Sequence, residues 1–167
     1  EGLKAFRRKD GKVSLFRPQE NARRMAATAR RTCMAEVPEE LFVEACNRVV
    51  RENLEFLPPY GTGGSMYVRP LLFGSGAQIG VAAADEYTFL VLVTPVGAYY
   101  KGGLQAVKAI VLDHYDRAAP LGTGHIKVAG NYAVSLYPHL EAKHAGYPVE
   151  LYLDAKEHKW IEEFATS

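Results

Sequence analysis

The sequence has little cysteine, almost no excess of charge and no long hydrophobic run, and each shortage excludes a class of protein. Its 167 residues include only two cysteines, Cys33 and Cys46, which are too few for a disulfide scaffold and are not spaced as CxxC. Twenty basic residues against nineteen acidic ones leave a net charge of +1, so no strong field favours nucleic acid or an anionic membrane surface. No apolar run reaches the roughly 18 residues of a membrane-spanning helix. We therefore expect a protein of a reducing, cytoplasmic compartment, with no nucleic-acid partner and no membrane partner, whose cysteines pack as small apolar residues.

The sequence also lacks the common metal-binding and nucleotide-binding motifs. The five histidines fall on different expected elements, and the spacing of His139 and His144 separates them around a helix rather than stacking them. The stretch 74–80 reads GxGxxxG, one residue out of step with the dinucleotide fingerprint, and no helix pattern follows it. The sequence therefore predicts no metal site and no nucleotide site.

The first hundred residues combine strand and helix patterns. Asp10-Gly11 is a dipeptide that accepts two positive φ angles in a tight hairpin turn, and proline begins each of two amphipathic stretches. Later segments are rich in β-branched and aromatic residues, as buried strands are. The expected elements are a hairpin over 3–16, helices over 18–33 and 38–57, and strands over 66–73 and 87–94.

A stretch rich in glycine and proline, 95–103, predicts a linker between two domains. After it we expect a strand over 106–112, a glycine-rich segment over 122–130, a helix over 131–144 and a hairpin formed by 149–153 and 159–164. The predicted fold class is α/β, of the α+β kind. The expected domains are a small N-terminal α+β domain over 1–94, the linker 95–103, and the start of a large, incomplete domain over 104–167.

Lys127 is the residue of this second part with the clearest chemical potential. Apolar and small residues flank it, an environment that could desolvate its amine and favour nucleophilic use. A lone lysine near a glycine-rich turn is more often simply solvated, so this environment by itself does not establish a catalytic role.

Five strings, in order along the chain, resemble the branched-chain amino acid aminotransferases, which are pyridoxal-phosphate enzymes of fold type IV. The strings are EGLKAFR at 1–7, YVRP at 67–70, PVGAY at 95–99, KVAGNY at 127–132 and the segment 153–166. The resemblance implies the two-domain fold of that class and pyridoxal 5'-phosphate as the cofactor. It also implies that the chain is a fragment, without the N-terminal start and most of the large domain, and inactive alone.

The resemblance assigns cofactor contacts residue by residue. Lys127 would hold the cofactor as a Schiff base and then move the α-proton of the substrate. Tyr132 would hydrogen-bond the phenolic oxygen of the cofactor, and Glu163, rather than its neighbour on the opposite face of the strand, would face the pyridine nitrogen. Arg24 and Thr166 would bind the cofactor phosphate, for which a guanidinium offers two donors at once.

Three further residues would lie on the substrate side. Tyr67 and Tyr99 would form pocket walls, and Arg69 would point toward the substrate carboxylate. A plainer interpretation also exists, because Tyr67 and Arg69 share one face of a strand and could merely pack and pair. Arg24 likewise has a plainer interpretation, since several other arginines decorate the same expected helix.

The reaction that the resemblance implies is transfer of the amino group of leucine, isoleucine or valine to 2-oxoglutarate. The expected partners are therefore branched-chain amino acids, their 2-oxo acids, glutamate and 2-oxoglutarate, with a homodimer as the expected assembly. Two alternatives stay open. The chain could be another enzyme of the class, a D-amino-acid aminotransferase or an aminodeoxychorismate lyase, or a non-catalytic assembly module. Retention of Lys127, Tyr132, Glu163 and Arg24 together argues against the module.

Overall fold

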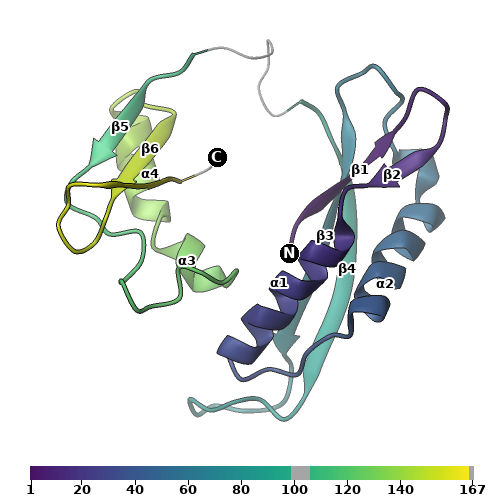
Figure 1. Ribbon diagram of the computed structural model, residues 1–167, viewed down its shortest axis with the longest axis horizontal. Coiled ribbons are helices and arrows are strands. Elements are labelled where there is room, and N and C mark those ends of the chain that lie inside the picture. The colour runs from purple at the N-terminus through teal and green to yellow at the C-terminus, as the bar shows by residue number, and fades with distance from the viewer. Residues whose placement is uncertain (99–105, 166–167) are drawn as a thin grey trace. The chain divides into compact units, whose positions relative to one another are not determined.

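The chain divides into two compact units, Glu1–Gly103 and Leu104–Ser167, and each is described by itself. The computed structural model describes residues 1–98 and 106–165 (Figure 1). Within these residues no helix combines the length and the apolar character that crossing a membrane requires.

The first unit is built on an antiparallel sheet with the strand order β2-β1-β3-β4. Its strands are β1 (Leu3–Arg7), β2 (Val13–Leu15), β3 (Ser65–Gly74) and β4 (Tyr87–Val96). The two longest strands pair along their whole length, from Ser65 opposite Val96 to Gly74 opposite Tyr87. The predicted strands of this unit are therefore confirmed.

Two details of this sheet differ from the sequence-based expectation. The loop from β1 to β2 spans Arg8–Lys12, and within it only Gly11 has a positive φ, of 81°. Asp10 instead accepts a hydrogen bond from the backbone N–H of Lys12 through its side chain, so the expected turn with two positive φ angles is wrong. Pro95 and Val96, expected in the linker, belong to β4 because they pair with Met66 and Ser65.

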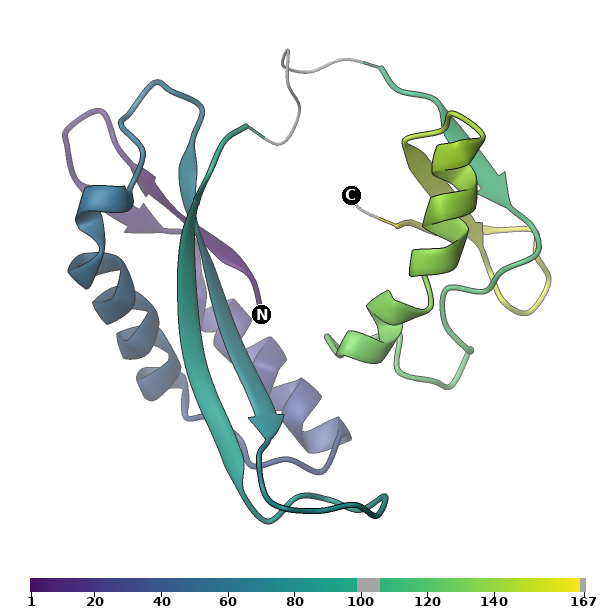
Figure 2. The ribbon, with the colours of Figure 1, turned by 180° about the vertical axis from the view of Figure 1, so that it is seen from behind.

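Helices α1 (Pro18–Arg31) and α2 (Glu39–Glu52) lie on one side of this sheet (Figure 2), and a short 3-10 helix, η1 (Leu54–Phe56), follows them. Both helices begin at or next to a proline, with glutamate in the first turn and arginine in the last, which suits the helix dipole. Their apolar stripes and alternate residues of β1 and β3 form the core: Leu3, Ala5, Ala22, Met25, Phe42, Cys46, Val50, Met66 and Val68.

The second unit has a sheet with the order β5-β6-β7, in which β5 is parallel and β7 antiparallel to β6. Its elements are β5 (Ala109–Leu112), α3 (Ala129–Ala133), α4 (Leu136–His144), β6 (Val149–Leu153) and β7 (Ile161–Phe164). Helix α4 packs against β6. The expected hairpin near the end of the chain is confirmed.

The single helix expected over 131–144 is wrong, because two helices occupy these residues. Pro138 has no N–H and would clash with the preceding turn inside a long helix, so it is tolerated only within the first turn of α4. At the break, Ser135 donates its backbone N–H to the carbonyl of Tyr132, three residues back, which is a tighter turn than an α-helix makes.

The two cysteines differ in environment. Cys46 is buried in the core of the first unit, as expected, and burial raises the pKa of its thiol to about 12. Cys33 is exposed, so the expectation that it packs as an apolar residue is wrong. It follows α1 with a φ of 56°, in the turn by which the chain leaves the helix.

We predict that a thiol-alkylating reagent labels Cys33 in the native protein and labels Cys46 only after unfolding. The thiolate is the reacting form, and burial both disfavours it at Cys46 and blocks access of the reagent. Peptide mapping by mass spectrometry before and after denaturation measures both sites in one sample. Equal labelling of the two thiols in the native protein would contradict the burial of Cys46.

Candidate functional site

Lys127 and Tyr132, which the resemblance pairs, lie in direct contact in the second unit. Lys127 precedes α3 and Tyr132 lies within it. The Nζ of Lys127 donates a hydrogen bond of 2.7 Å to the Tyr132 hydroxyl, and it lies 4.7 Å from the centre of the tyrosine ring. The structure therefore places an amine and a phenol at one point, where a ligand could contact both.

Asn131 closes the glycine-rich loop that carries Lys127. Its Nδ2 donates hydrogen bonds to the carbonyls of Thr123 at 2.7 Å and Ile126 at 2.8 Å, and its Oδ1 accepts one from the Thr123 hydroxyl at 2.8 Å. A side-chain amide can donate twice and accept as well, so one residue ties both ends of the loop. Sequence reasoning missed Asn131; a single amide next to a glycine-rich stretch was the available signal.

Arg117 connects this loop to β7. Its side chain is 9% exposed, and its Nε lies 2.7 Å from Oε1 of Glu163, whose side chain is 52% exposed. The Nε–H is not aligned with that oxygen as a hydrogen bond, so the contact is an ion pair. Arg117 also donates from Nη1 to the Asn131 carbonyl, and its guanidinium carbon lies 5.5 Å from the centre of the Tyr132 ring. Sequence reasoning missed Arg117 as well.

Asp154 closes the turn that leads into β7 and so helps to fix the strand that carries Glu163. Its carboxylate accepts hydrogen bonds from the backbone N–H groups of Trp160 at 2.7 Å, Lys159 at 2.9 Å and Glu157 at 2.8 Å. These bonds, that of Trp160 foremost, lower the pKa of Asp154 to about 2. The carboxylate therefore stays charged, and holds the turn, at all physiological pH values.

The side chains of Glu162 and Glu163 lie in different environments. A hollow of about 420 Å³ is lined by Glu162, His125, Asp154 and Lys156, among others, and not by Glu163. Successive residues of a strand point to opposite faces. Glu163 instead contacts Arg117, so the two carboxylates have different surroundings.

In the first unit, Tyr67 and Arg69 lie together on β3. The Nη2 of Arg69 donates to the Tyr67 hydroxyl at 3.3 Å, and the guanidinium carbon lies 5.2 Å from the centre of the tyrosine ring. Met66 and Val68 face the helices in the core, so Tyr67 and Arg69 point to the opposite face of the sheet. The two residues do pair, as the plainer interpretation expects, on a face that the unit's own helices leave uncovered.

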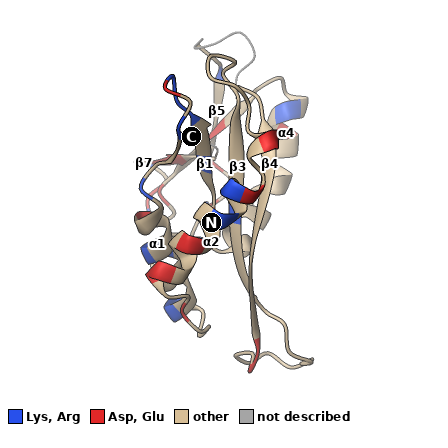
Figure 3. Cartoon of the chain, turned by 90° about the vertical axis from the view of Figure 1, so that its right-hand side faces the viewer, with Lys and Arg blue, Asp and Glu red and all other residues tan. Residues whose placement is uncertain are grey.

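Arg24 pairs with a buried carboxylate. Its Nη2 lies 2.6 Å from Oε2 of Glu1, whose side chain is 2% exposed, and its Nε donates to both Glu1 oxygens at 3.1 Å. Basic and acidic positions are both present on α1 (Figure 3), where Arg23 pairs with Glu20 of the same helix and with Glu39 of α2. The side chains of those three residues are all partly exposed, so Arg24 differs from its neighbour in having its guanidinium oriented by a buried group.

Two residues of the expected site, Tyr99 and Thr166, lie outside the described residues. Among the residues that are described, no cluster of three or more histidine, cysteine, aspartate or glutamate side chains could hold a metal ion.

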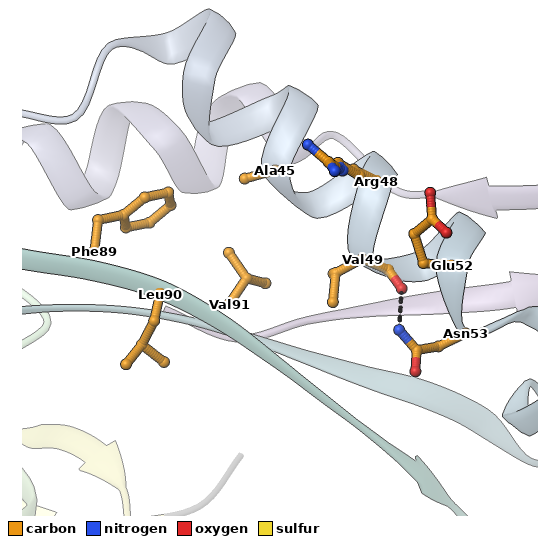
Figure 4. Close-up of a pocket in the computed structure, with 8 residues that line it drawn as sticks. All are labelled: Ala45, Arg48, Val49, Glu52, Asn53, Phe89, Leu90 and Val91. Atoms are coloured by element: carbon orange, nitrogen blue, oxygen red, sulfur yellow. Dashed lines mark hydrogen bonds between the residues drawn. The ribbon is translucent and has the colours of Figure 1, made fainter.

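A groove of about 340 Å³ lies between α2 and β4 of the first unit (Figure 4). Phe89 and Val91 point toward the helix, and Leu90 points to the other face of the sheet. At its end the Nδ2 of Asn53 donates to the carbonyl of Val49 at 2.8 Å, capping α2. None of the residues expected in the site lines this groove.

Similarity to curated proteins covers nearly the whole chain. The branched-chain-amino-acid aminotransferase of Haemophilus influenzae is 55% identical over 98% of this chain and 49% of the relative. That of Helicobacter pylori is 49% identical over 98% of this chain and 48% of the relative. The chain is a relative of the branched-chain amino acid aminotransferases. It spans about half the length of the curated aminotransferases it matches, and no protein-family model matches it.

Solved structures of these aminotransferases share the fold. The aminotransferase from T.th., solved with pyridoxamine 5'-phosphate, matches with a TM-score of 0.76 at 28% identity, over 99% of this chain and 52% of that one. The aminotransferase from Escherichia coli matches with a TM-score of 0.74 at 28% identity, over 99% of this chain and 50% of that one. The expected α/β class of fold-type-IV aminotransferases is confirmed.

We predict that Asn131→Ala lowers the free energy of unfolding by about 1–3 kcal/mol, because it leaves partly buried loop carbonyls without their donor. It should also speed hydrogen exchange of the amides over 123–127. Urea denaturation and exchange measured by mass spectrometry test both effects. Asn47→Ala is the matched control, since Asn47 is exposed on α2, and it should change stability by less than about 0.5 kcal/mol. Equal effects of the two substitutions would contradict the loop closure.

Proposed function

We propose that this chain carries the pyridoxal 5'-phosphate site of a branched-chain-amino-acid transaminase, with Lys127 as the residue that binds the cofactor covalently. The observation that carries the proposal is the contact of 2.7 Å between Lys127 Nζ and the Tyr132 hydroxyl, in a unit where Arg117 joins the same loop to Glu163. The names of the curated relatives support the same activity, and one matching aminotransferase structure is complexed with N-(5'-phosphopyridoxyl)-L-glutamate.

The residues of the second unit fit this cofactor chemically. An aldehyde needs an amine, a phenolic oxygen needs a hydrogen-bonding partner, and a protonated pyridine nitrogen needs an acceptor. Lys127, Tyr132 and Glu163 supply these three groups. When bound, the cofactor supplies an electron sink that stabilises negative charge at the α-carbon of the substrate.

Lys127 then has a second task as a general acid and base. Its Nζ would take the α-proton from the substrate and deliver it to the carbon of the cofactor's former aldehyde group, so one proton moves between two carbons and none is lost. Tyr132 keeps that nitrogen in place by accepting its hydrogen bond, and the loop closed by Asn131 fixes the backbone of the lysine. Glu163 would keep a proton on the ring nitrogen of the bound cofactor by accepting a hydrogen bond from it.

The substrates proposed are leucine, isoleucine and valine, with 2-oxoglutarate as the amino-group acceptor, and the products are the branched 2-oxo acids and glutamate. The family resemblance supports Arg24 and Thr166 as phosphate ligands, Tyr67 and Tyr99 as pocket walls, and Arg69 as the residue for the substrate carboxylate. It also supports a homodimer. The cysteine content and even charge balance favour a cytoplasmic protein.

Incubation with pyridoxal phosphate, reduction with borohydride and peptide mapping test the covalent site. We expect a single adduct on Lys127, because its amine is held in a closed loop against Tyr132. Lys127→Arg should abolish the adduct, and Lys143→Arg, at an exposed lysine of α4, should leave it unchanged. Labelling scattered over surface lysines, or an adduct that persists in Lys127→Arg, would refute the proposal.

A further inference from the structure

Arg117 makes contacts that the proposed chemistry of Lys127, Tyr132 and Glu163 leaves unexplained. It is a cation with 9% exposure in a small unit, and burying a charge costs free energy unless a partner compensates it. Its partner is the Glu163 carboxylate on β7, and its second contact is the Asn131 carbonyl in α3. One buried guanidinium therefore contacts both the strand and the helix of the proposed site.

We propose that Arg117 is a positioning residue that holds Oε1 of Glu163 and so presents the other oxygen, Oε2, to the ring nitrogen of the cofactor. This inference rests on the proposed function. Glu163 lies on a short strand at the edge of the sheet and is half exposed, so its side chain would otherwise sample several rotamers. With Oε1 held 2.7 Å from a buried guanidinium nitrogen, the second oxygen has fewer orientations to sample.

The charge of Arg117 also acts on the shared proton. A proton between a carboxylate and a pyridine nitrogen can lie on either group. A cation in contact with the carboxylate favours its charged form. The proton then stays on the ring nitrogen, and Glu163 remains the acceptor of the hydrogen bond.

Arg117 further couples the two ends of the site. Its Nη1 holds the Asn131 carbonyl, and its guanidinium lies over the ring of Tyr132, the residue that accepts the hydrogen bond of Lys127. The cofactor ring is rigid, so the amine at one end and the carboxylate at the other must keep a fixed separation. A side chain that contacts both elements maintains that separation.

The test uses cofactor labelled with ¹⁵N at the ring nitrogen, bound to the protein and to Arg117→Met, Arg117→Lys and Arg8→Met. Arg8 pairs with Asp10 on an exposed loop and serves as the matched control. The readouts are the pH titration of the ring-nitrogen resonance and the cofactor dissociation constant from absorbance. Circular dichroism verifies that each variant folds, and borohydride trapping verifies the bond to Lys127.

We expect the ring nitrogen of the unsubstituted protein and of Arg8→Met to stay protonated across neutral pH. In Arg117→Met the pH midpoint for titration of the ring nitrogen should fall. The cofactor dissociation constant should rise about tenfold, because the loss of a residue that orients a ligand-binding side chain typically weakens binding by at least that factor. Arg117→Lys retains the positive charge but lacks the planar guanidinium with its several N–H donors. The ring nitrogen should therefore stay protonated in this variant, while the cofactor binds more weakly. Trapping at Lys127 should persist in every variant.

An Arg117→Met protein that folds, traps the cofactor at Lys127 and titrates like the unsubstituted protein overturns the positioning role alone. If Arg117→Met does not fold, Arg117→Lys decides, and cofactor affinity equal to that of the unsubstituted protein overturns the role. Absence of trapping in the unsubstituted protein overturns the proposed function and, with it, this inference.

Discussion

The ion pair between Arg117 and Glu163 is the contact on which the arrangement of the second unit depends. It joins the short edge strand β7 to the segment between β5 and α3. The same arginine reaches the Asn131 carbonyl, and Asn131 closes the loop around Lys127. Removing the Glu163 carboxylate would be costly because it would leave the buried guanidinium of Arg117 uncompensated. Stability of the unit and geometry of the proposed site are therefore linked through one side chain.

The first unit uses a different kind of constraint. Its helices and alternate residues of β1 and β3 form one apolar core, and Tyr67, Arg69 and Leu90 point to the opposite face of the sheet. Tyr67 and Arg69 stack on that face, and Arg24 is oriented by the buried carboxylate of Glu1. Packing in the core thus fixes the strands and the helix that carry Tyr67, Arg69 and Arg24, whose side chains lie outside the core.

Much of this architecture was predictable from local pattern. Proline-initiated helices and β-rich strands of the first unit appeared where expected, because helix capping and strand composition act within a few residues. Local pattern failed to predict the break before Pro138, which divides the expected helix over 131–144 into two, and the exposure of Cys33 in a turn. Asn131 and Arg117 were missed for another reason. Their partners lie largely outside the local turn and are mostly backbone carbonyls, which carry no sequence signal. The roles of Lys127, Tyr132 and Glu163 came from family resemblance, and the structure adds the contacts that connect them.

A crystal structure of the protein grown with pyridoxal phosphate tests the central claim most directly, namely that Lys127, Tyr132 and Glu163 form one cofactor site held by Arg117. The account predicts electron density continuous from Lys127 Nζ into the cofactor, with the phenolic oxygen at Tyr132 and the ring nitrogen at Oε2 of Glu163. Arg117 should remain on Oε1. Cofactor bound away from Lys127, or bound there with its ring nitrogen turned from Glu163, would contradict the account.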